Sequence, residues 1–507
     1  MVFAAIFGAG QVTDAFRIAF TIPNLTRDLF AEGALSSAFV PVFTEYLSTK
    51  NKEEAARLAN LVASSIILIV GGICLMGAIF AEFLVLLMAP GFQEDPEKLA
   101  LTVSMTRIMF PFLLLVALAA QAMGILNACN RFGVPATAST MFNIVSLVAG
   151  LLLGKAFGPW LGISEIHGMA YGIVIGGAAQ LVWQIPSLRS AGFRFRFSID
   201  RMHPGVRRIL LLMGPAILGN AAVQINVAVN SNLASRLGDG PVSWLGYAFR
   251  FMQLPIGIFG YAIASATLPA ISRNAAANDT QAFRETLSRS LGLVFLLTVP
   301  SAVGLAVMGE SIIAAIYQWN KFTAADTRQT AQALAFYAIG LAGYAAAKVL
   351  NPAFYALGDA RTPMAVSLSS VLINFTVAYS VVQFAGFGHA GLALSTSTVA
   401  IFSSVALFII MRKRIGGIYG RNLWRSFSRV TLASAVMGTV VWGTSHFIRA
   451  TLGIGKAAQL LNLAIAIPLG IAVLWFACRA LRIAELETAM NALAGPLRRR
   501  MGMRSPK

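Results

Sequence analysis

Long apolar segments alternate with short polar connections along the whole chain, and this pattern predicts membrane-spanning helices. Residues 58–80, for example, contain no acidic or basic side chain. A helix rises about 1.5 Å per residue, so an apolar segment of this length crosses roughly 30 Å of hydrocarbon. Helices also satisfy their own backbone hydrogen bonds, which lipid cannot do. The predicted fold class is therefore an all-α polytopic membrane protein.

Thirteen segments are long enough to span a bilayer. They lie near residues 23–45, 58–88, 99–127, 134–155, 168–188, 206–234, 242–272, 286–317, 328–357, 363–386, 390–411, 427–449 and 457–481. Residues 2–7 are apolar but too few to span. We expect them to be the end of a truncated first helix rather than a signal peptide, because no basic segment precedes them.

Composition excludes a soluble protein and the charges predict the topology. Hydrophobic residues make up 57% of the 507 residues and only 12% are charged, whereas a soluble domain has about 25% charged residues. The net charge of +19 is concentrated in the connections near 189–208 and 412–429 and in the C-terminal tail, whereas the connection 89–98 is net acidic. The positive-inside rule places the basic connections in the cytoplasm. With fourteen helices, both termini are then cytoplasmic.

Other function classes lack their signatures. The arginines are not interleaved with aromatic residues in a nucleic-acid-binding module, so we expect no nucleic-acid partner. Cys74, Cys129 and Cys478 are far apart and have no metal-ligand spacing. We therefore expect no metal, no cofactor and no enzyme activity. A membrane-embedded transferase or phosphatase is the alternative, and it would need an acid–base or metal-binding set.

Two matches at one offset indicate an internal repeat. Residues 31–44 align without gaps with 259–272, and residues 127–135 align with 355–363 at the same offset along the chain. We expect two six-helix lobes in a parallel pseudo-repeat, with a purely structural duplication as the alternative. The predicted parts are an N-terminal lobe with an incomplete first helix (1–190), a basic cytoplasmic connection (191–205), a C-terminal lobe (206–415), an extra helix pair (424–483) and a basic cytoplasmic tail (484–507).

The repeat predicts charges inside the membrane. In the second copy, residues 251–272 are free of charge and follow Arg250. A span of equal length in the first copy must include Arg27, Asp28 and Glu32. Such charges usually face one another or a water-filled cavity. Arg27 and Asp28 could instead form an interfacial pair, but Glu32 lies about 14 Å along the helix from Pro23 and is harder to explain in that way.

A polar cavity with cationic points would suit an anionic substrate, because the guanidinium fork holds phosphate oxygens bidentately. Asp14 and Arg17 add to this mixed-sign cluster. Weaker candidates are amides within predicted spans, Asn230 and Asn374, for which interhelical hydrogen bonding is a more common use than ion coordination.

The stretch FGAGQVTDAFRIAFTIPNLTRDLFAEGALSSAFVPVFTEY (7–46) resembles the signature of the MurJ (MviN) lipid II flippases, members of the MOP exporter superfamily. GPAILG (214–219), SWLGYAFRFMQLPIGIFG (243–260), KFTAADT (321–327) and KVLNPAFYALGDARTP (348–363) fit in order. The resemblance implies fourteen helices in the bacterial cytoplasmic (inner) membrane. It also implies movement of the undecaprenyl-pyrophosphate-linked precursor lipid II from the inner to the outer leaflet by alternating access, for peptidoglycan biosynthesis.

The resemblance also implies roles for individual residues. Arg27 and Arg250 match cavity arginines that engage the pyrophosphate, and Asp14 and Glu32 match important acidic positions. Gln253 stands where the family often has an acidic residue. The helix pair 424–483 would extend a groove for the lipid tail. Implied partners are lipid II and membrane lipids, together with a coupling ion and cell-wall synthesis proteins. The alternative is another MOP-type transporter, either an O-antigen-type lipid-sugar flippase or a drug/cation antiporter, although the latter would favour an acid-dominated cavity.

Overall fold

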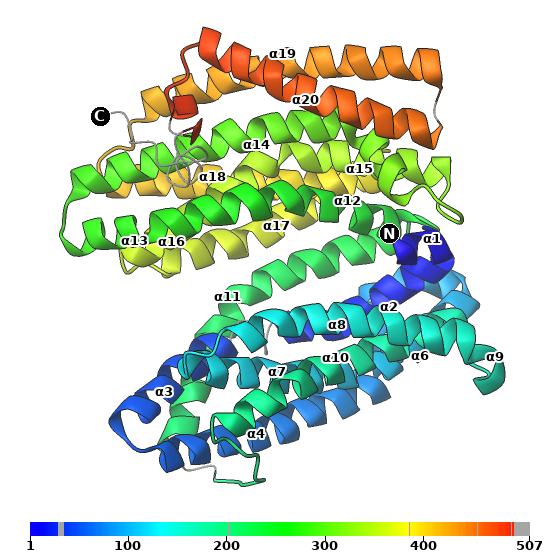
Figure 1. Cartoon of the computed structure of the whole chain (residues 1–507), viewed down its shortest axis with the longest axis vertical. Coiled ribbons are helices and arrows are strands. Elements are labelled where there is room, and N and C mark those ends of the chain that lie inside the picture. The colour runs from blue at the N-terminus through cyan, green and yellow to red at the C-terminus, as the bar shows by residue number, and fades with distance from the viewer. Residues whose placement is uncertain (29–34, 201–202, 385, 454, 488, 491–507) are drawn as a thin grey trace. The chain divides into compact units, whose positions relative to one another are not determined.

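The computed structural model describes the chain except for residues 29–34, 201–202, 385, 454, 488 and 491–507 (Figure 1). Within the described part, every regular element is a helix, as the apolar pattern predicts. The chain divides into two compact units. The first unit is Gly10–Val242, and the second unit combines Met1–Ala9 with Ser243–Lys507.

The first unit contains the helices up to the 236–240 loop. They are α2 (Gln11–Arg27), α3 (Ser36–Thr49), α4 (Lys52–Ile79), α5 (Ala81–Met88), η2 (Pro90–Glu94), α6 (Pro96–Met109), α7 (Pro111–Ala128), α8 (Gly133–Leu151), η3 (Leu152–Ala156), α9 (Gly158–Leu161), α10 (Glu165–Ser190) and α11 (Pro204–Ser235).

The second unit begins with α1 (Val2–Phe7) and resumes in the first turn of α12 (Pro241–Pro255). It continues through η4 (Ile256–Tyr261), α13 (Ala262–Ala276), α14 (Thr280–Tyr317), α15 (Ala324–Ile339), α16 (Leu341–Ala356), α17 (Arg361–Gln383), α18 (Gly388–Arg414), α19 (Gly420–Leu452) and α20 (Lys456–Ala480).

Capping residues begin several of these helices. The Asn51 side chain accepts a hydrogen bond from Glu54 N at 2.8 Å before α4, and Asp95 caps α6, which begins with a proline. Thr323 and Asp326 form a reciprocal capping box at the beginning of α15. Such side chains satisfy backbone N–H groups that have no partner inside the helix.

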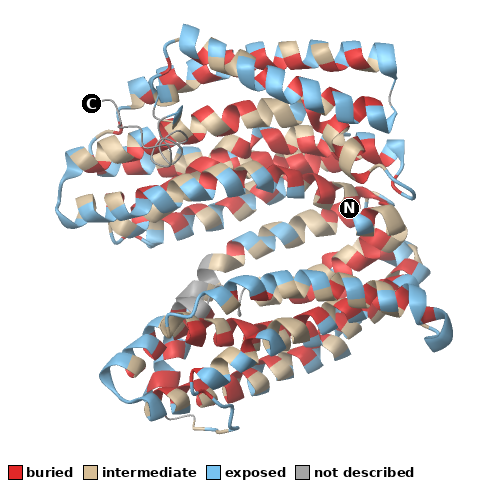
Figure 2. Cartoon of the chain, in the orientation of Figure 1, coloured by how far each residue is buried: buried red, intermediate tan, exposed pale blue. Residues whose placement is uncertain are grey.

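Small residues bring the helices of each unit close together. A Cβ atom added to Gly172 of α10 would lie 2.4 Å from Ser146 O of α8, so only glycine fits there. In membrane helices, where lipid is as apolar as leucine, close packing of small residues replaces much of the hydrophobic driving force. Many outward-facing side chains are nevertheless large and apolar, and Figure 2 shows the exposed residues along the outer faces of the helices.

The apolar helices support the prediction of a polytopic membrane protein. Among the described residues, nine helices are long and apolar enough to span a membrane. The count is ten if α15 and α16, which are bent by 45° relative to each other, form one span. These ten correspond to ten of the thirteen expected segments. Of the other three, 23–45 includes undescribed residues, and α11 includes undescribed side chains. The third is α19, which has 33 residues but a less apolar sequence with several hydroxyl groups.

Helix α11 packs with the first unit, although the repeat assigns residues 206–234 to the second lobe. Arg208 Nη1 lies 2.7 Å from Glu45 Oε2, and Asn232 donates to Leu87 O at 3.0 Å. The contacts therefore divide the chain just after this helix rather than before it. The lobe boundaries derived from the repeat stay a prediction about sequence correspondence.

Candidate functional site

Helix α2 carries three of the candidate residues and spreads them along its length. Asp14 and Arg17 lie near its beginning, and Arg27 is its last residue. The helix between Asp14 and Arg27 has a length of about 20 Å. The sequence predicts that Asp14, Arg17 and Arg27 belong to one cluster of mixed charge. In the structure these residues are instead spread along α2 in the first unit.

Arg27 is paired with its neighbour. Its Nη2 lies 2.9 Å from Asp28 Oδ1, and its Nε donates to the same oxygen at 3.2 Å. The side chains of Arg27 and Asp28 are 22% and 33% exposed. The pair is therefore accessible, which agrees with the alternative that the two residues form an ion pair at the membrane interface. Partly exposed ion pairs contribute only about 0–1 kcal/mol. An anion with more charge than one carboxylate can therefore replace Asp28 as the partner of Arg27.

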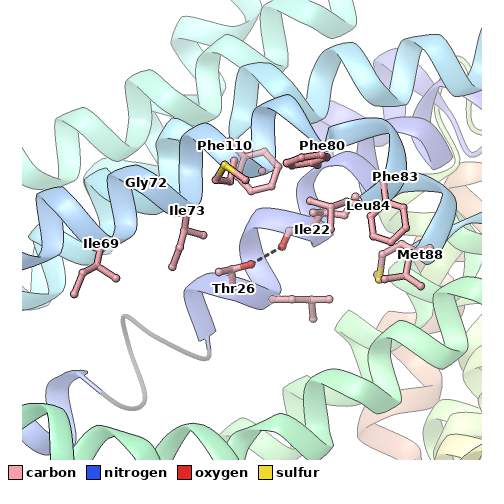
Figure 3. A pocket seen from close by; sticks show the side chains of 14 residues that line it. Ile22, Thr26, Ile69, Gly72, Ile73, Phe80, Phe83, Leu84, Met88 and Phe110 are labelled. Carbon is pink, nitrogen blue, oxygen red and sulfur yellow. Dashed lines mark hydrogen bonds between the residues drawn. The ribbon is translucent and has the colours of Figure 1, made fainter.

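An apolar cavity of about 970 Å³ lies in the first unit, between α2, α4 and α5. Figure 3 shows Ile22 and Thr26 of α2 on one side of it and Ile73 of α4 and Phe110 on the other. Its lining includes no charged residue, and Thr26 Oγ1 donates to Ile22 O at 3.2 Å. Leu25 and Thr26 line the cavity and directly precede Arg27. The helix segment that ends at Arg27 thus borders a space that suits hydrocarbon.

Asp14 is held by groups of the protein itself. Its side chain is completely buried, and Oδ2 accepts a hydrogen bond from Gly240 N at 2.7 Å and lies 3.6 Å from Lys98 Nζ. Lys98 Nζ also donates to Asp239 Oδ1 at 2.7 Å. Arg17, one turn further along α2, is half-buried. These contacts favour a structural role for Asp14 over direct contact with a substrate.

Arg250 and Gln253 lie on one exposed face of α12, in the second unit. Residues three apart on a helix are neighbours, so the pair presents a cation and an amide together. The opposite face is packed, because Ala248 and Met252 are buried. Since Arg27 and Arg250 belong to different units, their common site stays a prediction.

The remaining candidates differ in their surroundings. Asn374 of α17 is 1% exposed and accepts a hydrogen bond from Ser395 Oγ of α18 at 3.1 Å. This is the interhelical use that is common for amides in membranes. Asn230 is half-buried on α11. Glu32 lies outside the described residues.

Sequence reasoning missed Lys98 and Asp239. Both lie in short polar connections next to apolar runs, where charged residues normally contact water. In PEKLALT (96–102), Lys98 is the third residue of a helix capped by Asp95, and this pattern carries no signal for its burial. In the described part of the chain, no three His, Cys, Asp or Glu side chains are grouped closely enough to bind a metal ion.

Residues 3–462 match the model of a protein family described as lipid II flippase MurJ. The chain belongs to this family. A lipid II flippase MurJ of Burkholderia cenocepacia is 34% identical over 451 residues, which cover 88% of this chain and 86% of the relative. A probable lipid II flippase MurJ of Buchnera aphidicola from Acyrthosiphon pisum is 33% identical over 452 residues, with 88% and 86% covered.

Solved structures agree with the family assignment. A lipid II flippase MurJ in an inward closed conformation has a TM-score of 0.77 and 26% identity, with 95% of each chain covered. An inward-facing multidrug resistance MATE transporter of the MOP superfamily has a TM-score of 0.68 at 13% identity, covering 81% of this chain and 95% of that chain. The second likeness shows a shared fold alone.

Proposed function

We propose that this MurJ-family chain moves lipid II from the inner to the outer leaflet of the bacterial inner membrane. The observation that carries the proposal is the family match over residues 3–462, supported by relatives of nearly equal length that bear this name. The MATE likeness is one of fold only, so nothing specific favours a drug/cation antiporter. An O-antigen-type flippase has no supporting match among these relatives.

The physical problem of this transport is to carry two phosphate groups through hydrocarbon. Moving an isolated charge out of water is very costly unless another group replaces its hydration. We assign this replacement to Arg27 and Arg250, whose guanidinium groups stay charged and form bidentate bonds with phosphate oxygens. The 2.9 Å pair between Arg27 and Asp28 then acts as a resting partner that the pyrophosphate displaces.

The apolar cavity lined by Leu25 and Thr26, which precede Arg27 in α2, gives the first isoprene units of the substrate a place. Its lining of aliphatic and aromatic side chains, with Thr26 already hydrogen-bonded within its own helix, matches a hydrocarbon chain. The rest of the long tail stays in the bilayer and along the helix pair α19 and α20, as the family resemblance implies. No covalent bond is made or broken, and alternating access of the two units completes the movement.

The function is tested in a bacterial strain depleted of its own lipid II flippase. Expression of this chain, and of a form extended upstream, is expected to restore growth, whereas Arg27→Glu is expected to abolish it. Arg57→Glu is the matched control, because Arg57 is an exposed arginine of α4 in the same unit. Absence of growth with both forms, despite normal amounts in the membrane, contradicts the proposed function. Growth with Arg27→Glu contradicts only the site.

A further inference from the structure

The helix pair α19 and α20 is attached to α14 by polar side chains near the connection from α19 to α20. All three helices belong to the second unit, and each of them contacts the other two. Figure 1 shows the pair beside α14. Arg449 of α19 and Asn462 of α20 both donate to the Ser311 hydroxyl of α14, at 2.8 Å and 2.9 Å. One oxygen atom thus joins two helices to a third.

The register of the two helices places Arg449 and Asn462 at the same level. A Cβ atom added to Gly470 of α20 would lie 2.9 Å from Val441 Cγ2 of α19, so these two residues face each other. Arg449 follows Val441 by eight residues. Asn462 precedes Gly470 by the same number. Because the helices run antiparallel, both steps lead about 12 Å toward the same end of the pair. The contacts with Ser311 therefore mark one layer of the hairpin.

This layer is buried although it is polar. Ser311 and Asn462 are completely buried. Gln459 and Ser445, which lie about one helical turn from Asn462 and Arg449, are each 4% exposed. Polar groups that are removed from water are costly unless they form hydrogen bonds, and hydrocarbon offers them no partner. The partners must therefore come from within the layer itself.

Four polar atoms of the layer have no hydrogen-bond partner among the described residues. They are Asn462 Oδ1, Gln459 Oε1, Ser445 Oγ and Arg449 Nε. The guanidinium Nε is a donor, the two amide oxygens are acceptors, and the hydroxyl group can act as either. A buried water molecule typically makes about three hydrogen bonds, and it can accept from such a donor while it donates to such acceptors. The set thus complements bound water, whereas the guanidinium group would repel a cation and the amide oxygens would repel an anion.

Charged groups extend the attachment toward the connection between the helices. Arg449 Nη1 lies 2.7 Å from Glu310 Oε2, so the guanidinium group contacts two neighbouring residues of α14. Lys456, the first residue of α20, places its Nζ 3.8 Å from the centroid of the Trp319 ring, just after the end of α14. Both cations come from the helix pair. Further from the connection, the contact includes an apolar cluster of Met308, Met437, Val441 and Ala466.

We propose that Ser311, Arg449 and Asn462, together with bound water, are positioning residues that anchor one end of the pair α19 and α20 to α14. The anchored pair forms a fixed wall for the isoprenoid tail, and the three residues act without contact to the substrate. Hydrogen bonds are directional, whereas apolar helix faces gain little from each other over lipid. The anchor therefore sets a position that apolar packing alone leaves variable. This inference rests on the proposed function, which places the tail along this pair.

The position of the pair is measured within the second unit. Spin labels at Ala325→Cys and Leu460→Cys, after replacement of the three native cysteines by alanine, report the distance between α15 and α20. Both labelled positions are exposed. Arg449→Met removes the hydrogen bonds and the charge of a partly exposed side chain, and it is expected to broaden the distance distribution. Arg449→Lys keeps the charge and is expected to restore the distribution in part. Arg425→Met replaces an exposed arginine of the same helix and is the control, expected to match wild type.

Transport of two substrates separates a positioning role from a purely structural one. One substrate is lipid II with its undecaprenyl tail. The other carries a farnesyl tail, which is short enough to lie in the apolar cavity of the first unit. Arg449→Met is expected to lower transport of the long-tailed substrate about tenfold, and that of the short-tailed substrate less than about twofold, because only the long tail needs the wall in its correct position. Arg425→Met is expected to change neither rate.

Each part of the proposal has an outcome that overturns it. Asn462→Leu removes the second hydrogen bond to Ser311 and is used if Arg449→Met does not fold. An unchanged distance distribution in both variants overturns the anchor. Equal losses for the two substrates overturn the positioning role.

A structure that resolves water molecules is expected to show density between Arg449 Nε and Asn462 Oδ1, and a dry contact there overturns the bound water. If wild type transports neither substrate while its distance distribution still responds to Arg449→Met, the proposed function fails and the anchor stands.

Discussion

The turn between α7 and α8 has the same backbone conformation as the turn between α16 and α17. The two turns differ in charge, because the first carries Arg131 where the second carries Asp359. Asn130 and Gly358, which correspond to each other in the internal repeat, have φ angles of 57° and 72°. Arg131 N donates to Leu126 O and Asp359 N donates to Phe354 O, each at 2.9 Å. Both turns thus close the preceding helix with a left-handed residue and a long backbone hydrogen bond. The offset found in the sequence recurs here in hydrogen bonds.

The side chains of the two turns attach to the end of a later helix in different ways. Arg131 donates to Ser187 O at 3.1 Å and to the Ser190 hydroxyl at the end of α10. Asp359 instead accepts hydrogen bonds from the N–H groups of Arg361 and Thr362 and from Arg414 at the end of α18. The first turn is exposed, while Asp359 is 9% exposed. The two turns that the predicted repeat aligns therefore share their backbone conformation and differ in the chemistry of the attachment.

This difference limits what the repeat can say about function. Ala-Phe-Arg occurs at both Arg17 and Arg250, yet Arg17 is half-buried in α2 and Arg250 is exposed on α12. Equivalent positions share their helix geometry more reliably than their contacts. A role assigned to an arginine in one copy consequently needs its own evidence in the other.

The largest effect is expected from Asp359→Ala. The substitution leaves two backbone N–H groups, the Thr362 hydroxyl and Arg414 without their acceptor, and lost partners of buried groups cost about 1–3 kcal/mol. We expect a loss of about 2–3 kcal/mol in the free energy of unfolding, measured by thermal unfolding in detergent. Asp359→Asn, which keeps one carbonyl oxygen, is expected to lose less. Equal stability of Asp359→Ala and wild type contradicts the role of this turn.

A smaller effect is expected at the left-handed positions. A Cβ atom at Gly358 would meet nothing within 4 Å, so Gly358→Ala tests backbone conformation without a clash. The left-handed region costs a residue with a Cβ atom roughly 1–2 kcal/mol, and asparagine tolerates it better. We expect Gly358→Ala to lose about 1 kcal/mol and Gly358→Asn to lose less, measured by the same unfolding assay. Asn130→Gly is expected not to destabilise the protein, because glycine adopts the left-handed conformation easily. A loss of stability in Asn130→Gly would show that the first turn depends on the asparagine side chain rather than on a left-handed backbone.

The smallest effect is expected from Arg131→Ala. Its hydrogen bonds are exposed and reach neutral oxygens, so we expect a loss of about 0.5 kcal/mol that changes little with salt. Arg414→Ala removes an ion pair, and its effect is expected to shrink as the salt concentration rises. Unfolding curves at two salt concentrations separate the two cases. If the stability loss of Arg131→Ala also shrank strongly with added salt, Arg131 would act through its charge, and the two turns would not differ in this way.

Much of the architecture follows from patterns in the sequence. The apolar runs predict the helices because lipid offers the backbone no partners, and the proline-anchored matches give the register of the repeat. The breaks within runs were not predicted. Residues 58–88 divide at Phe80 into α4 and α5, and residues 99–127 divide at Phe110 before a proline. The packing of α11 with the first unit depends on contacts such as Arg208 with Glu45 that no local pattern reveals.

The candidate site was predictable in part. Charges within an apolar span identified Arg27 and Asp28, because such residues are costly in lipid without a partner. The same reasoning grouped Asp14 with them, although its contacts are with Lys98 and the backbone of Gly240. Sequence patterns identify which residues need partners. They do not identify the partners when these come from distant connections of the chain.

The most direct test of the account is the amount of lipid II that reaches the outer leaflet when this chain is the sole flippase. Proteoliposomes containing the purified chain and labelled lipid II are treated from outside with an impermeant quencher after lipid II is introduced on the inside. The account predicts time-dependent quenching with wild type and with Arg57→Glu, and none above protein-free vesicles with Arg27→Glu. Quenching that is equal in all four samples would contradict it.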